Sequence, residues 1–285
     1  MACVGFIIIL VILIVGLLAP LVSPNDPIKI DLSRRLQAPQ LEFQFSIINI
    51  FSQRPRLILG QFPLGSDHLG RCILSRIIHG TQVSLRTSFL VLLIIITVGI
   101  FIGTLSGYIG GKLDNVIVSV IDMLLAFPGL ILALAIAGML GPSITNVMIA
   151  IASVAWVGYA RIIRGMVVSI KEKEYVLAAR SVGTGGPGII LRHVLPNVVS
   201  PVIVLATLDM GSIILSISGL SFLGLGAQPP MPEWGAMLND GRPYMQTAPW
   251  LMIFPGLAIL TAVLSFNLMG DGLRDIFDPK GIRRL

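Results

Sequence analysis

The stretch from Glu174 to Asn197 reads EYVLAARSVGTGGPGIILRHVLPN, and it is polar, basic and rich in glycine within a chain that is otherwise mostly Leu, Ile, Val and Ala. Its first part, residues 171–182, favours a helix. Four side chains of that helix share one face: Tyr175, Ala178, Ala179 and Val182. Small side chains at the centre of the face allow another surface to approach closely. The spacing therefore predicts recognition of a second surface rather than catalysis.

The same stretch carries the signals of a turn and a second helix. Gly183 follows the first helix at the position where a left-handed residue ends a helix. Gly185 and Gly186 then predict a turn. Pro187 suits the first turn of a new helix, because its missing N–H would have no partner there in any case. The sequence therefore predicts a compact helix-turn-helix.

A second apolar run leads past His193 to Leu195 and Pro196, where the next membrane helix is expected to begin. A lone histidine invites a metal or catalytic interpretation, but a hydrogen-bonding residue of the loop is favoured, and no catalytic or metal-binding residue is predicted in the chain. The whole connection has about 35 residues, which is far longer than an ordinary connecting loop.

Composition places this loop in a membrane protein. Of the 285 residues, 55% are hydrophobic and 12% charged, and the mean hydropathy is +0.92. This is more apolar surface than a water-soluble core can hide. The net charge of +6 fits basic cytoplasmic loops, and nucleic-acid binding is not expected because no basic stretch is interleaved with stacking aromatics. Six apolar stretches are long enough to span a membrane: residues 2–22, 88–108, 115–140, 144–163, 198–220 and 250–270.

The distribution of Lys and Arg predicts the orientation. With six spans, residues 109–114, 161–196 and 271–285 share one side and hold one, six and four basic residues, whereas residues 223–248 on the other side hold one. The long segment 23–87 is set aside, because the positive-inside rule holds for short loops. The loop 161–197 and both termini are therefore expected to be cytoplasmic.

The chain divides accordingly into a first transmembrane helix (1–22), an extracytoplasmic segment (23–87), a five-helix transmembrane core (88–270) that includes the cytoplasmic loop 161–197, and a cytoplasmic tail (271–285). The first stretch could instead be a signal peptide, but it has no basic n-region and no clear cleavage site before Pro24, so a retained helix is favoured. The five prolines of the outer segment predict a surface cap of short pieces.

Two carboxylates are expected inside the membrane. Asp122 lies seven residues into the third span, about 10 Å deep at about 1.5 Å per residue, and Asp209 lies near the middle of the fifth. Ionisable groups at such depth usually face a bundle interior or a water-filled path. For Asp122 a structural hydrogen bond and a place on a translocation path both stay open, and for Asp209 the path is favoured. Pro128 interrupts the third span, either as a kink repaired by neighbours or as a flexible gate.

The loop resembles the EAA loop of ABC-importer permease subunits, which docks the ATPase. Ala178-Ala179, Gly183 and Leu195-Pro196 fall at the spacing of that motif. Leu177 stands where the motif has its glutamate and His193 where it has an isoleucine, so Glu174, three residues earlier, is the candidate acidic group.

Further motifs resemble the C-type permeases of the dipeptide, oligopeptide and nickel branch. LGSDHLGR at residues 64–71 is similar to the outer-segment signature of that branch, with Ser66 in place of Thr and Cys72 in place of the final Asp. AFPGLILALAI, SFLGLGAQPPMPEWGAML and FNLMGDGLRDIFDPK resemble its third span, the exit of its fifth span and its C-terminus. The longer stretch 41–61 does not match.

The resemblance implies an all-α polytopic fold of the type I importer permease, with about six transmembrane helices, a cytoplasmic helix-turn-helix coupling loop and an outer cap. It implies a bacterial inner-membrane protein that works with a homologous second permease, two cytoplasmic ATPases, an extracytoplasmic solute-binding protein and membrane lipid. ATP and Mg would be used by the ATPases and no cofactor would be bound by this chain, which has no Gly-x-x-x-x-Gly-Lys-Ser/Thr phosphate loop.

Two rival classes are a secondary transporter or channel and a structural subunit of an energy-converting membrane complex. Neither explains the loop with Ala178, Ala179 and Gly183. Secondary transporters often show internal repeats and paired intramembrane charges, and the sequence displays neither an internal repeat nor a charge relay. Peptide import is the preferred function, and import of nickel or a metal-metallophore complex is the alternative.

Overall fold

The part of the chain that the structure describes is helical and contains no β-strand. The computed structural model describes residues 2–39 and 62–277, and these form helices plus one isolated bridge between Ser66 and Cys72. The predicted fold class, an all-α polytopic membrane protein, is confirmed. The non-matching stretch 41–61 and the last residues of the predicted tail, 278–285, lie outside the described residues.

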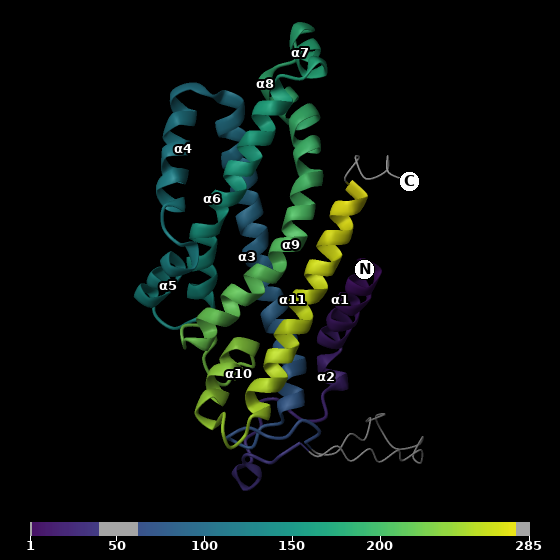
Figure 1. The fold of residues 1–285 in the computed structure, drawn as a ribbon, viewed down its shortest axis with the longest axis vertical. Helices are drawn as coiled ribbons and strands as arrows, with labels where there is room; N and C mark the ends of the chain where they lie inside the picture. Colours follow the sequence, from purple (N-terminus) through teal and green to yellow (C-terminus); the bar gives the residue numbers. More distant parts are fainter. Residues whose placement is uncertain (1, 40–61, 278–285) are drawn as a thin grey trace.

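Four helical runs are long and apolar enough to cross a membrane (Figure 1): α3 (Ile73–Ile109), α6 (Ile144–Lys171), the run Gly186–Phe222 that contains α9 (Leu195–Phe222), and α11 (Trp250–Phe277). A fifth candidate span is the pair α4 (Gly111–Leu125) and α5 (Gly129–Leu140). The first helix, α1 (Ala2–Leu17), has 16 residues and is followed by the short α2 (Ala19–Val22). The count of six spans therefore stays a prediction.

The third predicted span, residues 115–140, is two helices rather than one kinked helix. α4 and α5 meet at 85° across a break of three residues, Ala126, Phe127 and Pro128. Proline has no N–H to donate to the preceding turn, and it disfavours helical backbone at the residue before it. No continuous helix forms across the break, so the chain bends sharply at Pro128.

α3 begins at Ile73, not near Ser88 as hydropathy predicted. Its first turns carry Ser75, Arg76 and Thr81, all buried. These polar side chains are covered by the outer segment and by the short α10 (Trp234–Gly241), which the sequence did not predict. A hydropathy window detects contact with lipid and therefore misses helix that is buried against polar protein surface.

The most extensive helix–helix contact in the described residues joins α3 to α6. Gly99, Gly103 and Gly107 lie on one face of α3, and a Cβ at any of them would come within 3 Å of an α6 atom. At Gly103, for example, that atom is the carbonyl oxygen of Ala160, at 2.7 Å. Small residues at spacings of four allow such backbone approach between membrane helices. The α3–α6 pair is thus the centre of the bundle.

The two polar regions lie at opposite ends of this bundle. In Figure 1, α7 (Glu174–Ser181) and α8 (Gly186–Ile189) project at one end, and residues 23–39, residues 62–72 and α10 gather at the other. The coupling loop, residues 161–197, and the outer segment are therefore separated by the full length of the membrane helices.

Candidate functional site

The predicted recognition helix is α7, the first helix of the long connection between α6 and α9. Val176 is fully buried and holds the helix against the loop, whereas Tyr175 and Val182 are 46% and 87% exposed. Ala178 is exposed and Ala179 half-buried. The predicted face is therefore open to solvent except at Ala179, and a partner surface can reach the alanines.

Gly183 ends α7 in the conformation that the sequence predicted. Its φ is +91°, which L side chains rarely adopt. The N–H of Thr184 donates to the carbonyl of Ala179 at 3.0 Å, and the N–H of Gly183 donates to the carbonyl of Arg180 at 3.0 Å. These two bonds make a Schellman motif, which satisfies the last carbonyls of the helix. The angle between α7 and the following turn is thereby fixed.

The second half of the loop is continuous with the membrane. α8 starts after Gly185 with Pro187 in its first turn, as predicted, and then passes through a π-helical turn, Ile190–Val194, into α9. His193 is half-buried within the π turn, and its ring lies 6.2 Å from that of Tyr175. Short π turns inside helices occur frequently at functional sites, and this one was not foreseen.

The remaining predicted loop residues are spread along the same surface. Glu174 is the first residue of α7 and is exposed. Leu195 is half-buried and Pro196 exposed in the first turn of α9. His193 also stacks its ring at a tilt against Tyr175, so the two halves of the loop meet at this pair.

An ion pair that the sequence reasoning missed fastens α4 beside the loop. Asp114, in the first turn of α4, accepts two hydrogen bonds from the guanidinium of Arg164, at 2.6 and 2.7 Å, and another from Ser106. Lys171, at the end of α6, donates to the carbonyl of Gly107 at 3.1 Å. The ends of α3, α4 and α6 are therefore held together at the level of the coupling loop.

The coupling loop contacts the last turn of α3 through Tyr108. Its hydroxyl lies 3.3 Å from the place that a Cβ on Gly186 would occupy. The second helix of the loop thus packs on the last turn of α3. The sequence places Asp114 just after one apolar run and Arg164 near the end of another, an arrangement that favours an ion pair. It does not show which acidic residue meets which basic residue.

Both predicted intramembrane carboxylates have neighbours. Asp122 forms an ion pair with Arg161 of α6, and these side chains are 56% and 52% exposed. Asp209 is half-buried in α9, next to the Tyr159 hydroxyl, which is buried and has no hydrogen bond of ordinary geometry among the described residues. Pro128 is exposed at the bend before α5. These three residues do not gather into one site.

A second charged cluster ties the outer segment to α10. The carboxylate of Asp67 accepts from the Arg71 Nε at 2.6 Å and from the backbone N–H groups of Leu69 and Arg71 at 2.9 Å. Asp240 of α10 lies 3.4 Å from Arg71 and 3.8 Å from Arg76. Both arginine side chains are at most 3% exposed, whereas Asp240 is 28% exposed. The LGSDHLGR signature therefore carries a buried ion-pair network.

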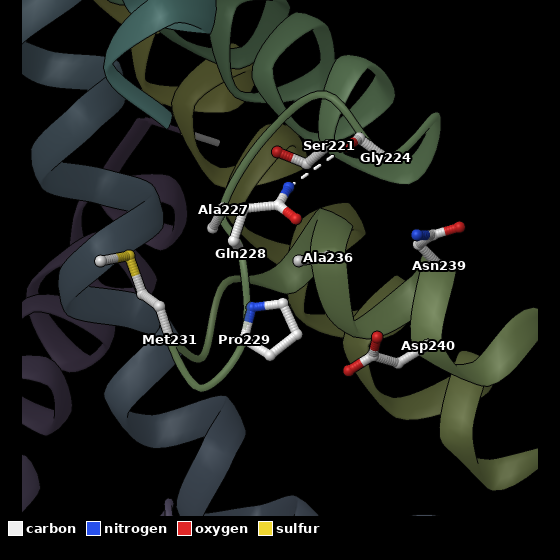
Figure 2. A pocket seen from close by; sticks show the side chains of 9 residues that line it. All are labelled: Ser221, Gly224, Ala227, Gln228, Pro229, Met231, Ala236, Asn239 and Asp240. Carbon is white, nitrogen blue, oxygen red and sulfur yellow. Dashed lines mark hydrogen bonds between the residues drawn. The ribbon is translucent and has the colours of Figure 1, made fainter. Parts of the chain in front are cut away.

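Figure 2 shows the cavity beside this network. It has a volume of about 50 Å³, and Asn239 and Asp240 reach it from α10 while Gln228 reaches it from the loop that follows α9. Gln228 donates to the carbonyls of Gly224 and Gly226 at 3.2 and 3.1 Å, so the loop is closed on itself. A cavity of this size holds one or two waters.

Glu233 begins α10 from a fully buried position. Its carboxylate accepts from the N–H groups of Gly235 and Ala236 at 2.9 and 2.8 Å, and from the Ser84 hydroxyl at 3.3 Å. Burial raises the pKa of Glu233, and the hydrogen bonds from Gly235 and Ala236 oppose that shift. The carboxylate caps α10 and joins it to α3.

Two family descriptions match this chain. Residues 95–283 match the description "Binding-protein-dependent transport system inner membrane component". Residues 1–39 match "N-terminal TM domain of oligopeptide transport permease C". Together the two matches include α1, the coupling loop and both carboxylates predicted within the membrane.

Individual relatives are similar over most of their length. The dipeptide transport system permease protein DppC of Alkalihalophilus pseudofirmus is 41% identical over 98% of this chain and 86% of its own. The nickel transport system permease protein NikC of Escherichia coli K12 is 42% identical over 96% of this chain and 92% of its own. The glutathione transport system permease protein GsiD of Pectobacterium atrosepticum is 46% identical over 76% of this chain and 72% of its own.

The outer network predicts unequal effects of two conservative substitutions. Asp67→Asn removes the tightest partner of buried Arg71, and the loss of one member of a buried pair costs about 3–5 kcal/mol. Asp31→Asn is the matched control, because the Asp31–Arg34 pair is 3.5 Å apart with both side chains near 40% exposed, and such pairs contribute little. We expect a clear fall in the melting temperature of the purified protein for Asp67→Asn alone. Equal melting temperatures for both variants would contradict this role of the network.

Proposed function

This chain belongs to the family of binding-protein-dependent transport system inner membrane components and is a permease subunit of an ABC importer, and we propose that it imports di- and oligopeptides. The observation that carries the proposal is the similarity to a dipeptide permease over 98% of the chain. A relative named for glutathione, itself a peptide, supports the same class. Nickel import is the second candidate, because a nickel permease is similar over 96% of the chain.

The family is one of transporter permeases rather than enzymes. We propose that two cytoplasmic ATPase subunits use ATP and Mg, that this chain binds no cofactor, and that one ATPase docks on the coupling loop. The support is the exposed face of α7, with Ala178 at its centre, presented at an angle fixed by the Gly183 motif. Tyr175 lies at one end of that face, and Tyr175, its neighbour His193 and Glu174 are proposed as polar contacts.

The second permease is proposed to cover the flank formed by α4, α5 and α6. Asp122 and Arg161 lie on helices that are candidate spans, and more than half of each side chain is exposed in the isolated chain. Charged side chains at membrane depth are costly in contact with lipid. A second permease that covers these side chains, with a water-filled path between the two subunits, removes that cost. We therefore propose that Asp122 and the bend at Pro128 lie at the interface between the two permeases. Asp209 is proposed to line the path from the α9 side.

The solute-binding protein is proposed to dock at the opposite end of the bundle. The Asp67, Arg71, Arg76 and Asp240 network supports this, because it holds the outer segment and α10 as one surface. We further propose a bacterial inner-membrane location with both termini and the coupling loop in the cytoplasm, since eleven basic residues lie on that side and one, Arg242, lies on the other outside the long segment 23–87.

The orientation is tested by labelling single cysteines in the Cys3→Ser background, in which the remaining Cys72 is buried. Cysteine at the exposed Ser181 is expected to react with an impermeant thiol reagent only in inside-out vesicles, and cysteine at the exposed Ser33 only in intact spheroplasts. Reaction of both cysteines from the same side would overturn the proposed orientation.

ATPase docking is tested by two substitutions in one turn. Gly183→Val places a β-branched residue at a φ of +91°, at a cost of about 1–2 kcal/mol, and tilts α7. Gly185→Val is the matched control, because Gly185 has a φ of −66° and nothing lies near a Cβ at either position. We expect Gly183→Val to weaken copurification of the ATPases and abolish ATP-driven uptake at normal membrane abundance, whereas Gly185→Val keeps both. Full uptake by Gly183→Val would remove the main support for the docking role.

Substrate class is tested by deleting the gene for this subunit and measuring uptake of labelled dipeptide, oligopeptide and nickel in cells complemented with the parent gene or with an empty vector. The proposal expects loss of peptide uptake with nickel uptake unchanged. Loss of nickel uptake alone would establish the second candidate instead.

A further inference from the structure

A large groove runs along the membrane part of the chain, separate from the coupling loop and from the outer network. It lies between α1, α3, α9 and α11 and has a volume of about 880 Å³. Its walls are almost entirely apolar, with Phe6 and Leu13 on α1, Phe89 and Leu93 on α3, and Phe266 on α11. The volume lies within the range of ligand sites, roughly 300–1,000 Å³.

Arg86 is the one charged residue among those that line the groove. It is exposed, and the described residues give it no ion pair or hydrogen bond. The neighbouring Gln82, by contrast, donates to the carbonyl of Gly16 at 2.7 Å and so holds the end of α1 against α3. The groove therefore carries one available positive charge at one point along an otherwise apolar surface.

The position of Arg86 along α3 indicates what kind of molecule fits the groove, because it places the positive charge at one end of the apolar part. Arg86 stands just before the apolar run that begins near Ser88, and the groove follows α3 as far as Ile96. At about 1.5 Å per residue, Arg86 and Ile96 are about 15 Å apart along the helix. That length is half of a hydrocarbon core about 30 Å thick. Arg86 therefore lies at head-group depth, and the groove extends from it to the bilayer centre.

We propose that this groove binds an anionic glycerophospholipid from the leaflet nearer α10, with its phosphate at Arg86 and an acyl chain along α3 toward Ile96. The guanidinium is a geometric match for a phosphate group, and the apolar walls accept the chain. The choice of lipid over a helix of the second permease rests on the proposed function, which places that subunit on the flank of α4 and α5. In Figure 1 this flank lies across the bundle from α1 and α11.

The bound lipid has a structural consequence for α1. α1 packs on α11 and α3, and 16 residues are fewer than the roughly 20 that span a bilayer. An acyl chain that contacts Leu13 on one side and Leu93 on the other fills the space between α1 and the bundle. The lipid is thus a packing element that holds the first helix in place.

The test uses the complete transporter complex, purified in mild detergent from the cell membrane, with its bound phospholipids extracted and quantified by mass spectrometry. Arg86→Gln is expected to lower bound phosphatidylglycerol about fivefold per complex, with phosphatidylethanolamine unchanged. Arg86→Lys keeps the charge and is expected to keep most of the lipid. Arg35→Gln, at an exposed arginine of the outer segment, is the control for loss of surface charge alone.

A second pair of variants tests the apolar part of the groove. Leu93→Trp fills it and is expected to displace the lipid, whereas Ile94→Trp adds the same bulk at the next residue, which is 45% exposed and does not line the groove. A photoreactive benzoylphenylalanine at Leu93 is expected to form an adduct with phospholipid in membranes.

Three outcomes would overturn the proposal. They are equal amounts of phosphatidylglycerol in Arg86→Gln and the parent complex, equal amounts in Leu93→Trp and Ile94→Trp, and an adduct between Leu93 and the second permease polypeptide. Only the adduct would also contradict the proposed placement of the second permease, and none of the three bears on the proposed substrate, which the uptake assay tests independently.

Discussion

The close packing of α3 on α6 is the constraint on which the other parts of this chain depend. Lipid tails are as apolar as leucine, so helices in a membrane gain little from the hydrophobic effect and associate through van der Waals packing and polar contacts. Gly99, Gly103 and Gly107 bring the two backbones together in the last third of α3. α6 leads into the coupling loop and α3 into α4, so this contact sets where both emerge from the bundle.

Charged side chains are buried at the outer end of the bundle and exposed on the α4–α6 flank. At the outer end, Arg71 and Arg76 are almost completely buried and are balanced by Asp67 and Asp240, an arrangement that is stable only while both carboxylates stay in place. On the α4–α6 flank, the Asp122–Arg161 pair is more than half exposed. The buried network fixes the shape of one end within the chain. The exposed pair leaves charged side chains on the surface of the α4–α6 flank.

Sequence was enough to predict local features, and it failed where the neighbours of a residue lie far away in the chain. The left-handed conformation of Gly183 was predicted, because the end of a helix depends on residues that are close in sequence. The start of α3 at Ile73 and the existence of α10 were missed, because their polar residues are buried by protein and hydropathy cannot distinguish that burial from exposure to water. The bend at Pro128 was located correctly, but its 85° angle was not, since packing of α5 against α6 decides the angle.

Direct contacts join the coupling loop to the ends of α3, α4 and α6. α8 passes through the π turn into α9 without a flexible linker, and Tyr108 joins the same segment to α3. The Asp114–Arg164 pair then fastens α4 to α6. α5 follows the three-residue break that ends at Pro128, and it also packs against α6. α4 and α5 are therefore both held by α6, one on each side of the bend at Pro128.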